Sequence, residues 1–431
     1  MTSHKNNNAA FETTSVNKTQ PTGATSGLIV VRIFLAFASG YFLSYALRAV
    51  NAALAPVLAE DLKLSAGELG WLSSAYFLAF AAMQIPVGIW LDRYGARRTE
   101  SALLIVAATG AAIVGVGDSL WLNSLGRILI GAGVAPCLMA SYAYFRRCFP
   151  PAQQPRLVMG MLLVGAAGAL AATQPALAMA NWIGWRQIYF MSAALLALSA
   201  LAVYFLTTDA DLQSPQAGDH TDSTNIWKLT THPVMLRIVP VCIFTIGGFS
   251  AMQTLWAGPW LTQTLGMSPD QASMVLLYLN ASLMVSYLVM GTASPWLLKT
   301  GLSLAKQSLI ALIWIPLVFI SMIVWQSQAS WICWLLFAPV IPAMFLLQTQ
   351  AALAFPGNVA GRILTTSNLM IFVGTFLVQW AIGLAVDTFN KLGMTHAAAL
   401  KMAFISLVVL QILSLIWFVM RAPERASQVK Q

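Results

Sequence analysis

Two long apolar segments are separated by the sequence Gly88-Ile-Trp-Leu-Asp92-Arg93-Tyr-Gly95-Ala-Arg97-Arg98. Its apolar beginning can end a membrane helix, whereas its basic end cannot lie in lipid and can pair with lipid headgroups. Gly95 allows a tight turn between antiparallel helices, and Gly88 allows a neighbouring helix to approach closely. Asp92 can cap a helix or pair with a nearby arginine. This stretch therefore predicts a short cytoplasmic turn between two membrane spans.

The composition of the whole chain is that of a membrane protein. Hydrophobic residues make up 58% of the 431 residues and charged residues only 9%, and the mean hydropathy is +0.74. Soluble domains carry roughly 25% charged residues. The formal net charge of +9 does not indicate a nucleic-acid-binding protein, because the basic residues lie in short loops between apolar runs. We therefore expect the lipid bilayer, and no nucleic acid, as the partner of this surface.

Apolar segments of about 20 residues or more recur along the chain, and each can cross a hydrocarbon core of about 30 Å. The sequence predicts an all-α membrane protein with twelve transmembrane helices in two pseudo-symmetric six-helix bundles. The predicted spans are 28–58, 66–90, 99–117, 120–145, 156–180, 186–207, 234–265, 270–297, 302–326, 330–355, 359–386 and 396–421. The predicted domains are a disordered cytoplasmic tail (1–27), an N-terminal bundle (28–207), a polar cytoplasmic linker (208–233), a C-terminal bundle (234–421) and a second cytoplasmic tail (422–431).

The distribution of lysine and arginine predicts the topology. With the N-terminus inside, 17 of the 23 basic residues fall in cytoplasmic segments and four in outer segments, while Arg48 and Arg127 lie within spans. Positive charge gathers on the cytoplasmic side of membrane proteins. We therefore expect a multi-pass protein of a bacterial inner (plasma) membrane, with both termini cytoplasmic, and we expect it to be a monomer.

The turn at 88–98 resembles the cytoplasmic motif between helices 2 and 3 of the major facilitator superfamily. Two further stretches are similar to signatures of that family in helix 4 and at the start of helix 6. They are Leu122, Arg127, Gly131 and Gly133 in span 4, and Gly184-Trp185-Arg186 followed by Phe190 before span 6. The resemblance implies a secondary transporter that works by alternating access, in which the two halves rock about a central site.

The same resemblance implies a role for the turn itself. In the family this region latches the cytoplasmic ends of the two halves in the outward-open state and releases them on rocking. The latch residues implied here are Gly88, Asp92, Arg93, Gly95, Arg97 and Arg98. Span 5 departs from the drug-antiporter pattern, because it lacks a Gly-Pro pair in mid-helix and has Pro175 alone near its outer end. This argues against a drug/proton antiporter.

A faint repeat supports the division into two sets of six spans. Arg156 precedes Gly168 by twelve residues in span 5, and Arg362 precedes Gly374 by twelve residues in span 11, the corresponding span of the second set. Internal repeats of this kind are typical of secondary transporters.

Arg48 is the strongest candidate for a binding residue. A charge inside a span costs about 2.5–3.5 kcal/mol on insertion scales, so it should face a water-filled cavity. Tyr41 and Tyr45 share its helix face, and Asn51 lies at the edge of that face. A planar guanidinium beside two phenol hydroxyls suits a carboxylate or phosphate, which arginine can hold through two hydrogen bonds. The alternative is an arginine that extends to the membrane interface or holds helices together.

The run from Tyr45 to Asn51 also resembles helix 1 of the organic-anion branch of the superfamily, which includes carriers of glycerol 3-phosphate and hexose phosphates. In that branch the arginine of helix 1 contacts the anionic substrate. The resemblance therefore implies the same contact for Arg48.

Four further residues are candidates for the same site. Arg127 has no acid near it in sequence, so a substrate role and a structural hydrogen-bonding role are equally open. Gln253, Trp256 and Asn368 offer polar groups in the second half, where interhelical hydrogen bonds are the commoner explanation. If both arginines face one cavity, that cavity strongly attracts anions.

Acidic residues and histidines are absent from the interiors of the predicted spans. None of the fourteen acidic residues lies near the middle of a span, and none of the four histidines lies inside one, since His396 only begins the last span. We therefore expect no buried proton carrier, although an anion could carry its own proton or exchange for another anion. The chain has no catalytic triad, no metal cluster and no phosphate-binding loop, so we expect no catalytic residue, no metal, no cofactor and no enzyme activity.

Three functions remain open at this point. The leading hypothesis is a secondary active transporter of a small organic anion. The first alternative is an exporter of amphipathic compounds or drugs, which the many aromatic residues favour. The second is a transporter-like membrane sensor that signals through a partner, which uptake into sealed vesicles would exclude.

The topology can be tested by labelling introduced cysteines in whole cells with an impermeant maleimide. Cysteine at Ser214 should react only from the cytoplasm, and cysteine at Thr395 only from outside, because the positive charges place these segments on opposite sides. The reverse pattern would overturn the predicted orientation.

Overall fold

The computed structural model describes residues 27–150, 152–209, 231–355 and 357–421. These residues are almost entirely helical, and no strand occurs among them. The predicted tails, except for Gly27, and most of the predicted linker lie outside the described residues.

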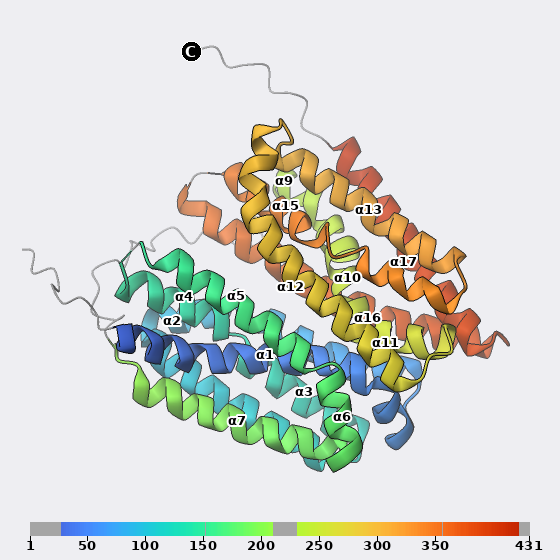
Figure 1. The fold of residues 1–431 in the computed structure, drawn as a ribbon, viewed down its shortest axis with the longest axis horizontal. Helices are drawn as coiled ribbons and strands as arrows, with labels where there is room; N and C mark the ends of the chain where they lie inside the picture. Colours follow the sequence, from blue (N-terminus) through green and yellow to red (C-terminus); the bar gives the residue numbers. More distant parts are fainter. Residues whose placement is uncertain (1–26, 151, 210–230, 356, 422–431) are drawn as a thin grey trace, which may run out of the picture.

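The first half of the chain supplies the helices drawn in blue to green in Figure 1. They are α1 (Gly27–Asp61), α2 (Ala66–Val116), α3 (Leu120–Val134), α4 (Cys137–Cys148), α5 (Gln154–Ala171), α6 (Gln174–Ile183) and α7 (Trp185–Leu206). Although α2 runs for 51 residues, it contains two predicted spans, because Gly95 interrupts it with φ 77° and ψ 169°. The tight turn predicted at Gly95 is therefore confirmed.

The second half supplies the helices drawn in yellow to red. They are α9 (Pro233–Val241), α10 (Gly248–Ala251), α11 (Ala257–Pro259), α12 (Pro269–Lys299), α13 (Leu304–Val324), α14 (Ile332–Leu335), α15 (Ile341–Leu353), α16 (Gly357–Lys391) and α17 (His396–Met420). Three π-helical turns separate the first pieces of this half, at Cys242–Gly247, Met252–Trp256 and Trp260–Thr264. A 3₁₀ turn, Gln328–Trp331, precedes α14.

The lengths of these helices agree with a polytopic membrane protein. Nine helices among the described residues are long and apolar enough to cross a membrane, and ten if the pair α5 and α6, bent by 44°, forms one span. The count treats α2 as a single helix and leaves out the shorter α15. The structure is thus consistent with twelve spans.

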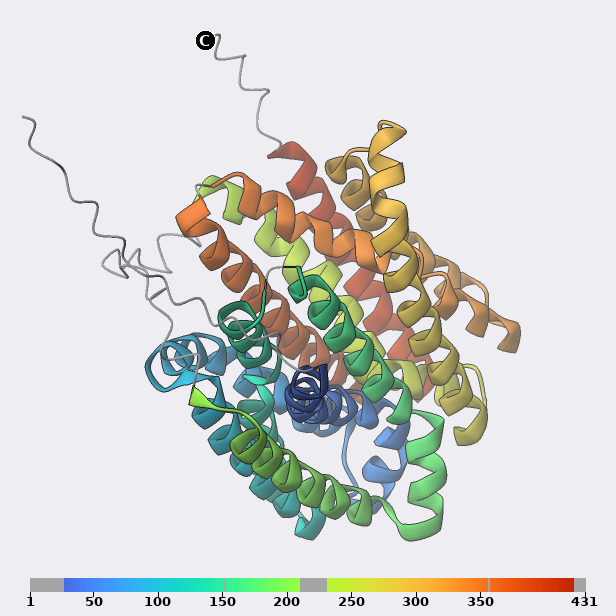
Figure 2. The ribbon, with the colours of Figure 1, turned by 60° about the vertical axis from the view of Figure 1, so that its left-hand side comes forward.

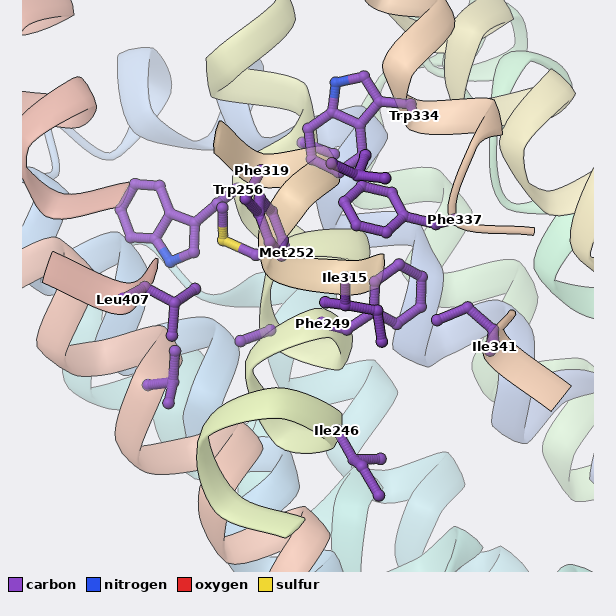
Figure 3. Packing of buried hydrophobic residues seen from close by; sticks show 14 of the residues in the cluster. Ile246, Phe249, Met252, Trp256, Ile315, Phe319, Trp334, Phe337, Ile341 and Leu407 are labelled. Carbon is purple, nitrogen blue, oxygen red and sulfur yellow. The ribbon is translucent and has the colours of Figure 1, made fainter. Parts of the chain in front are cut away.

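The buried side chains form two hydrophobic clusters, one in each half. The first cluster runs from Ile33 to Val203 and includes two residues of α16, and the second runs from Met235 to Phe418 and includes four residues of α1 and α2. In the second cluster Phe337 packs against Phe249 and Phe319, with ring centroids 5.1 and 4.8 Å away (Figure 3). The two halves therefore have separate cores that share side chains along α1, α2 and α16.

Several helices next to the boundary, α1, α5, α12 and α16, also line the candidate site. In Figure 2, α1 (dark blue) is viewed nearly along its axis and passes through the first half, where it contacts α5 and α7. Across the boundary, α12 contacts α5 and α6, and α16 contacts α2. These five helices connect the two halves, together with α1, which contacts α11 and α12.

The faint sequence repeat corresponds to equivalent packing in the two halves. A Cβ atom on Gly168 would overlap the carbonyl oxygen of Phe42 in α1, and one on Gly374 would overlap the backbone of Ile243 in the first π turn. In each half a glycine of the fifth span thus lets it touch the first span through the backbone. Gly88 behaves differently, because a Cβ there would meet no atom within 4 Å. The expectation that Gly88 allows a close helix approach is wrong for this conformation.

The contrast between these glycines gives a stability test. We expect Gly168→Ala to lower the melting temperature and the folded yield of detergent-purified protein, because the added methyl overpacks the contact at a cost of about 1–3 kcal/mol. Gly88→Ala is the matched control and should melt like the parent, since its methyl enters open space. Equal melting temperatures for the two variants would contradict the packing argument.

Candidate functional site

A cavity of about 460 Å³ lies where the two halves meet. Helices α1, α4 and α5 line it from the first half, and α10 with its neighbouring π turns, α12, α15 and α16 line it from the second. Its lining is mainly apolar and aromatic, and Ile246, Phe249 and Ile341, labelled in Figure 3, belong to it. The polar lining residues are Tyr41, Tyr45, Arg48, Ser250, Gln253, Thr254, Asn280, Tyr287 and Asn368.

Arg48 reaches this cavity within a cage of aromatic rings. Its guanidinium carbon lies 4.7 Å from the centroid of the Tyr45 ring and 5.0 Å from that of Phe80. The ring of Phe372, from α16 of the other half, lies 5.2 Å away. None of the ion pairs among the described residues includes Arg48, and its Nε has no hydrogen-bond partner there. The cavity therefore contains a cation that no carboxylate of the described residues neutralises.

Arg127 does not line the cavity but lies close behind it. Its side chain is buried, and its Nη1 donates a hydrogen bond of 3.0 Å to the carbonyl oxygen of Leu47, the residue before Arg48. The ring of Tyr76 lies 5.3 Å from the guanidinium carbon of Arg127 and 5.9 Å from that of Arg48. The two arginines thus share one aromatic neighbour, and both contribute positive potential on this side of the cavity.

Asn51 and Trp256, two other sequence candidates, make interhelical contacts instead of lining the cavity. Asn51 donates from Nδ2 to the hydroxyl of Ser73 and accepts a hydrogen bond from the hydroxyl of Tyr189. Trp256 donates from Nε1 to the carbonyl oxygen of Gln379. These bonds tie α1 to α2 and α7, and the seventh predicted span to α16.

The π turns explain why the side chains of Gln253 and Trp256 point to different places. Both belong to the π turn Met252–Trp256, where hydrogen bonds run from residue i to i+5 and a turn holds more residues than an α-helical turn. Side chains spaced for one α-helical face therefore rotate apart. Gln253 lines the cavity, while Trp256 and Trp260 are buried in the core of the second half. The sequence carries no clear signal for such turns beyond local glycines and prolines.

The structure also brings residues to the cavity that the sequence analysis missed as site candidates. Gln253 donates from Nε2 to Oδ1 of Asn280, which donates in turn from Nδ2 to the carbonyl oxygen of Leu276. Tyr287 follows Asn280 by seven residues and lines the same cavity. This spacing places both on one face of α12, so it is the signal that could have identified them.

The turn 88–98 makes ion pairs with other parts of the first half. Asp92 accepts a hydrogen bond of 3.1 Å from Nη2 of Arg147 in α4. Arg97 and Arg98 lie 3.5 and 2.9 Å from Asp209, just beyond α7. In this conformation the turn therefore binds α2 to α4 and to the end of α7.

The two halves are joined at the other end of α2. The carboxylate of Asp387, near the end of α16, accepts hydrogen bonds of 3.1 Å from the backbone N–H of Ala66 and 2.8 Å from that of Gly67. These N–H groups belong to the first turn of α2, which has no intrahelical acceptors for them. A Cβ atom on Gly383 would overlap the carbonyl oxygen of Ala66, so the backbones of α2 and α16 touch there.

One acidic residue contradicts the expectation that no acid is buried. Glu100, five residues after Gly95 in α2, is 0% exposed, and neither of its carboxyl oxygens has a hydrogen-bond partner among the described residues. It lies at the start of the third predicted span, away from the middle. The chain instead buries it against α1, where Gly40 leaves the space that its carboxyl group occupies.

The sequence profile of the Major Facilitator Superfamily matches residues 37–379. The chain belongs to this superfamily. Members of this superfamily are integral multi-pass membrane transporters of small molecules, not enzymes. Membership also agrees with the cavity between two helical halves.

Solved structures of the superfamily share this fold. A bacterial homologue of the human lysosomal transporter Spinster, in an inward-facing and unoccupied conformation, matches with a TM-score of 0.72 at 17% identity, over 93% of this chain and 98% of that one. A D-xylose–proton symporter matches with a TM-score of 0.73 at 15% identity, over 92% and 98%. At these identities the likeness concerns the fold alone.

The curated relatives match this chain over only part of their own length. The tetracenomycin C resistance and export protein of Streptomyces glaucescens is 23% identical over 52% of this chain and 45% of its own length. The drug efflux pump JefA of Mycobacterium tuberculosis is 26% identical over 44% and 36%, and the probable sulfoacetate transporter SauU of Cupriavidus necator is 25% identical over 40% and 41%. The match thus spans less than half the length of each relative.

The contact at Asp387 gives a test of what closes this end of the cavity. We expect Asp387→Asn to weaken it, because hydrogen bonds to a charged group contribute about 1.5–3 kcal/mol and an amide loses the charge. Spin labels at Lys63 and Lys391, measured by double electron–electron resonance, should show a population at longer distance in the variant. Asp270→Asn, at an exposed helix start, is the control. An unchanged distance distribution would contradict a closing role for Asp387.

Proposed function

We propose that this superfamily member transports a small amphipathic organic anion by alternating access, and that Arg48 binds the anionic group. The observation that carries the proposal is the guanidinium of Arg48 in the cavity, surrounded by rings and outside every ion pair of the described residues. Arg48 is half-buried within a membrane span, where a charge without a partner is unfavourable. A bound carboxylate, phosphate or sulfonate would supply the missing negative charge.

The residues around Arg48 suit such a group. The hydroxyls of Tyr41 and Tyr45 lie on the same wall and can donate hydrogen bonds to anionic oxygens. The fork of guanidinium N–H groups matches two oxygens of one anionic group. Arg127 adds long-range attraction from behind Tyr76.

The opposite wall suits the body of the substrate. It combines apolar and aromatic side chains with the amides of Gln253, Asn280 and Asn368. This favours a substrate with one anionic end and a larger apolar or aromatic part that carries a hydrogen-bonding group. Two relatives support an anion by their names, the probable sulfoacetate transporter and a hexuronate transporter of Bacillus subtilis.

In the proposed cycle this conformation faces the cytoplasm. The contacts of Asp387 and Gly383 close the end of α2 that the positive-inside count assigns to the outside. Rocking of the halves would break them and let the turn 88–98 latch the cytoplasmic ends in the outward-open state. We place the protein in a bacterial inner membrane, with both termini in the cytoplasm and as a monomer.

An exporter of amphipathic compounds is the second candidate function. The mainly apolar lining of the cavity and the export proteins among the relatives favour it. The charge of the ligand separates the two candidates. We therefore propose a thermal-shift and calorimetric screen of purified protein with benzenesulfonate, sulfoacetate, glucuronate and benzyltrimethylammonium. Preference for the cation would contradict the anion site, and uptake of a bound compound into sealed proteoliposomes would exclude a sensor.

Substitution of Arg48 tests the site directly. Arg48→Lys keeps the charge but loses the planar fork, and Arg48→Gln loses both. Removing one partner of a buried charged hydrogen bond costs about 2–5 kcal/mol, so affinity for the best anion of the screen should fall at least about tenfold in each variant. Isothermal titration calorimetry measures this fall, with melting temperature as a check on folding.

Arg237 provides the matched control. It also holds helices together, since its Nε donates a bond of 2.8 Å to the carbonyl oxygen of Phe418, but it lies outside the cavity lining. Arg237→Gln should lower the melting temperature and leave anion affinity unchanged. Normal anion affinity in well-folded Arg48→Gln protein would refute the site.

A further inference from the structure

Glu100 occupies a closed pocket between α1, α2 and α4. Its exposed fraction is 0%, and a Cβ atom on Gly40 of α1 would lie 3.1 Å from its Oε1. Only a glycine at that position leaves room for the carboxyl group without a shift of neighbouring atoms. The carboxyl group and the thiol of Cys137, in the first turn of α4, are neighbours.

This pocket does not provide what an ionised carboxylate requires. Within the part of the chain that the structure describes, neither oxygen has a hydrogen-bond partner and no ion pair includes Glu100. An unpaired carboxylate in the interior of a protein is strongly unfavourable, whereas the neutral acid is tolerated. In this conformation Glu100 is therefore compatible with a bound proton.

The pocket of Glu100 and the anion cavity share an electrostatic neighbour, the thiol of Cys137. Cys137 faces the pocket from α4, and the same thiol is within electrostatic range of Arg48 on α1. Arg48 follows Gly40 by eight residues, which is about 12 Å along the helix axis. Two charges at about 12 Å and an effective dielectric constant of about 20 change an equilibrium by about tenfold.

We propose that Glu100 is a proton-binding site whose occupancy is coupled to anion binding at Arg48. An ionised Glu100 repels an anion at Arg48, and a protonated Glu100 does not, so proton and anion favour each other's binding reciprocally. The proton binds an oxygen of the carboxylate, and no other bond changes. The coupling rests on the proposed function, because it requires an anion at Arg48, and it makes the transporter an anion–proton symporter.

The first experiment tests the proton site without any substrate. Infrared difference spectra of purified protein across a pH titration should contain a protonated-carboxyl band that Glu100→Gln removes. Glu60→Gln, at an exposed position of α1, should keep it. A spectrum unchanged by Glu100→Gln would overturn the proton site. Glutamine has the shape of the neutral acid, so the variant should fold, and Glu100→Asp keeps a titratable group as a second variant.

The second experiment tests coupling with benzenesulfonate as the probe. This anion stays ionised at any ordinary pH, so a proton that moves with it must be carried by the protein. In proteoliposomes with a trapped pH indicator, an inward benzenesulfonate gradient should acidify the interior. Glu100→Gln should transport the probe without acidifying the interior, whereas Glu100→Asp should transport it with acidification, as the parent does. Affinity in the parent should fall about tenfold from acid to alkaline pH, and in Glu100→Gln it should stay at the acid value.

The two proposals can fail separately. Binding and transport of benzenesulfonate by the parent without acidification would overturn proton coupling and leave the anion site standing. Absence of binding to the parent, together with a titrating Glu100 band, would overturn the anion site for this class of ligand and leave the proton site standing. A pH dependence of affinity that persists in Glu100→Gln would also overturn coupling through Glu100.

Discussion

A cation inside a membrane protein must meet a negative group or water, because the hydrocarbon around the protein offers neither. This constraint applies to two arginines in the first half of the molecule. Arg48 and Arg127 both lie against the ring of Tyr76, yet no ion pair among the described residues includes either one. The rings around Arg48 attract it through their π faces, which weakens but does not remove the need for a counter-charge. A cavity lined by both halves lies at that point, and a ligand bound there can supply the counter-charge.

Close backbone contacts place this charge between two halves that can still move. Some contacts between the halves are close backbone contacts at glycines: Gly258 lies against the carbonyl of Ala52, and Gly70 against that of Gln379. Others are aromatic, such as the ring of Phe372 in α16, whose centroid lies 4.5 Å from that of Phe80 in α2. The two separate hydrophobic cores keep each half intact when such contacts open. Each half thus has its own core, and glycine contacts together with aromatic packing form the boundary between them.

The sequence predicted those features that depend on local pattern. Apolar length predicted the spans, the glycine at 95 predicted the turn, and helical spacing predicted that Tyr41, Tyr45 and Arg48 share one face. It did not predict features that depend on contacts between distant segments. The π turns of the second half rotate Trp256 away from Gln253, and Glu100 is buried against α1, where Gly40, sixty residues earlier, leaves space for its carboxyl group. Asp387 reaches the start of α2 across 320 residues of sequence, which no local pattern records.

The first helical segment of α2 connects these distant events. It runs from Ala66 to the turn at Gly95, about 44 Å at 1.5 Å per residue, so its two ends lie on opposite sides of a membrane. One end is held by Asp387 of the other half, and the other end carries Asp92, bound to Arg147 of its own half. A tilt of α2 against α16 strains the contact at Asp387, whereas the pair of Asp92 and Arg147 lies within one half and moves with it. Glu100 lies in the next segment of α2, five residues beyond the turn. In the proposed cycle, α2 therefore carries both the contact with Asp387 that closes the outer end and the proposed proton site.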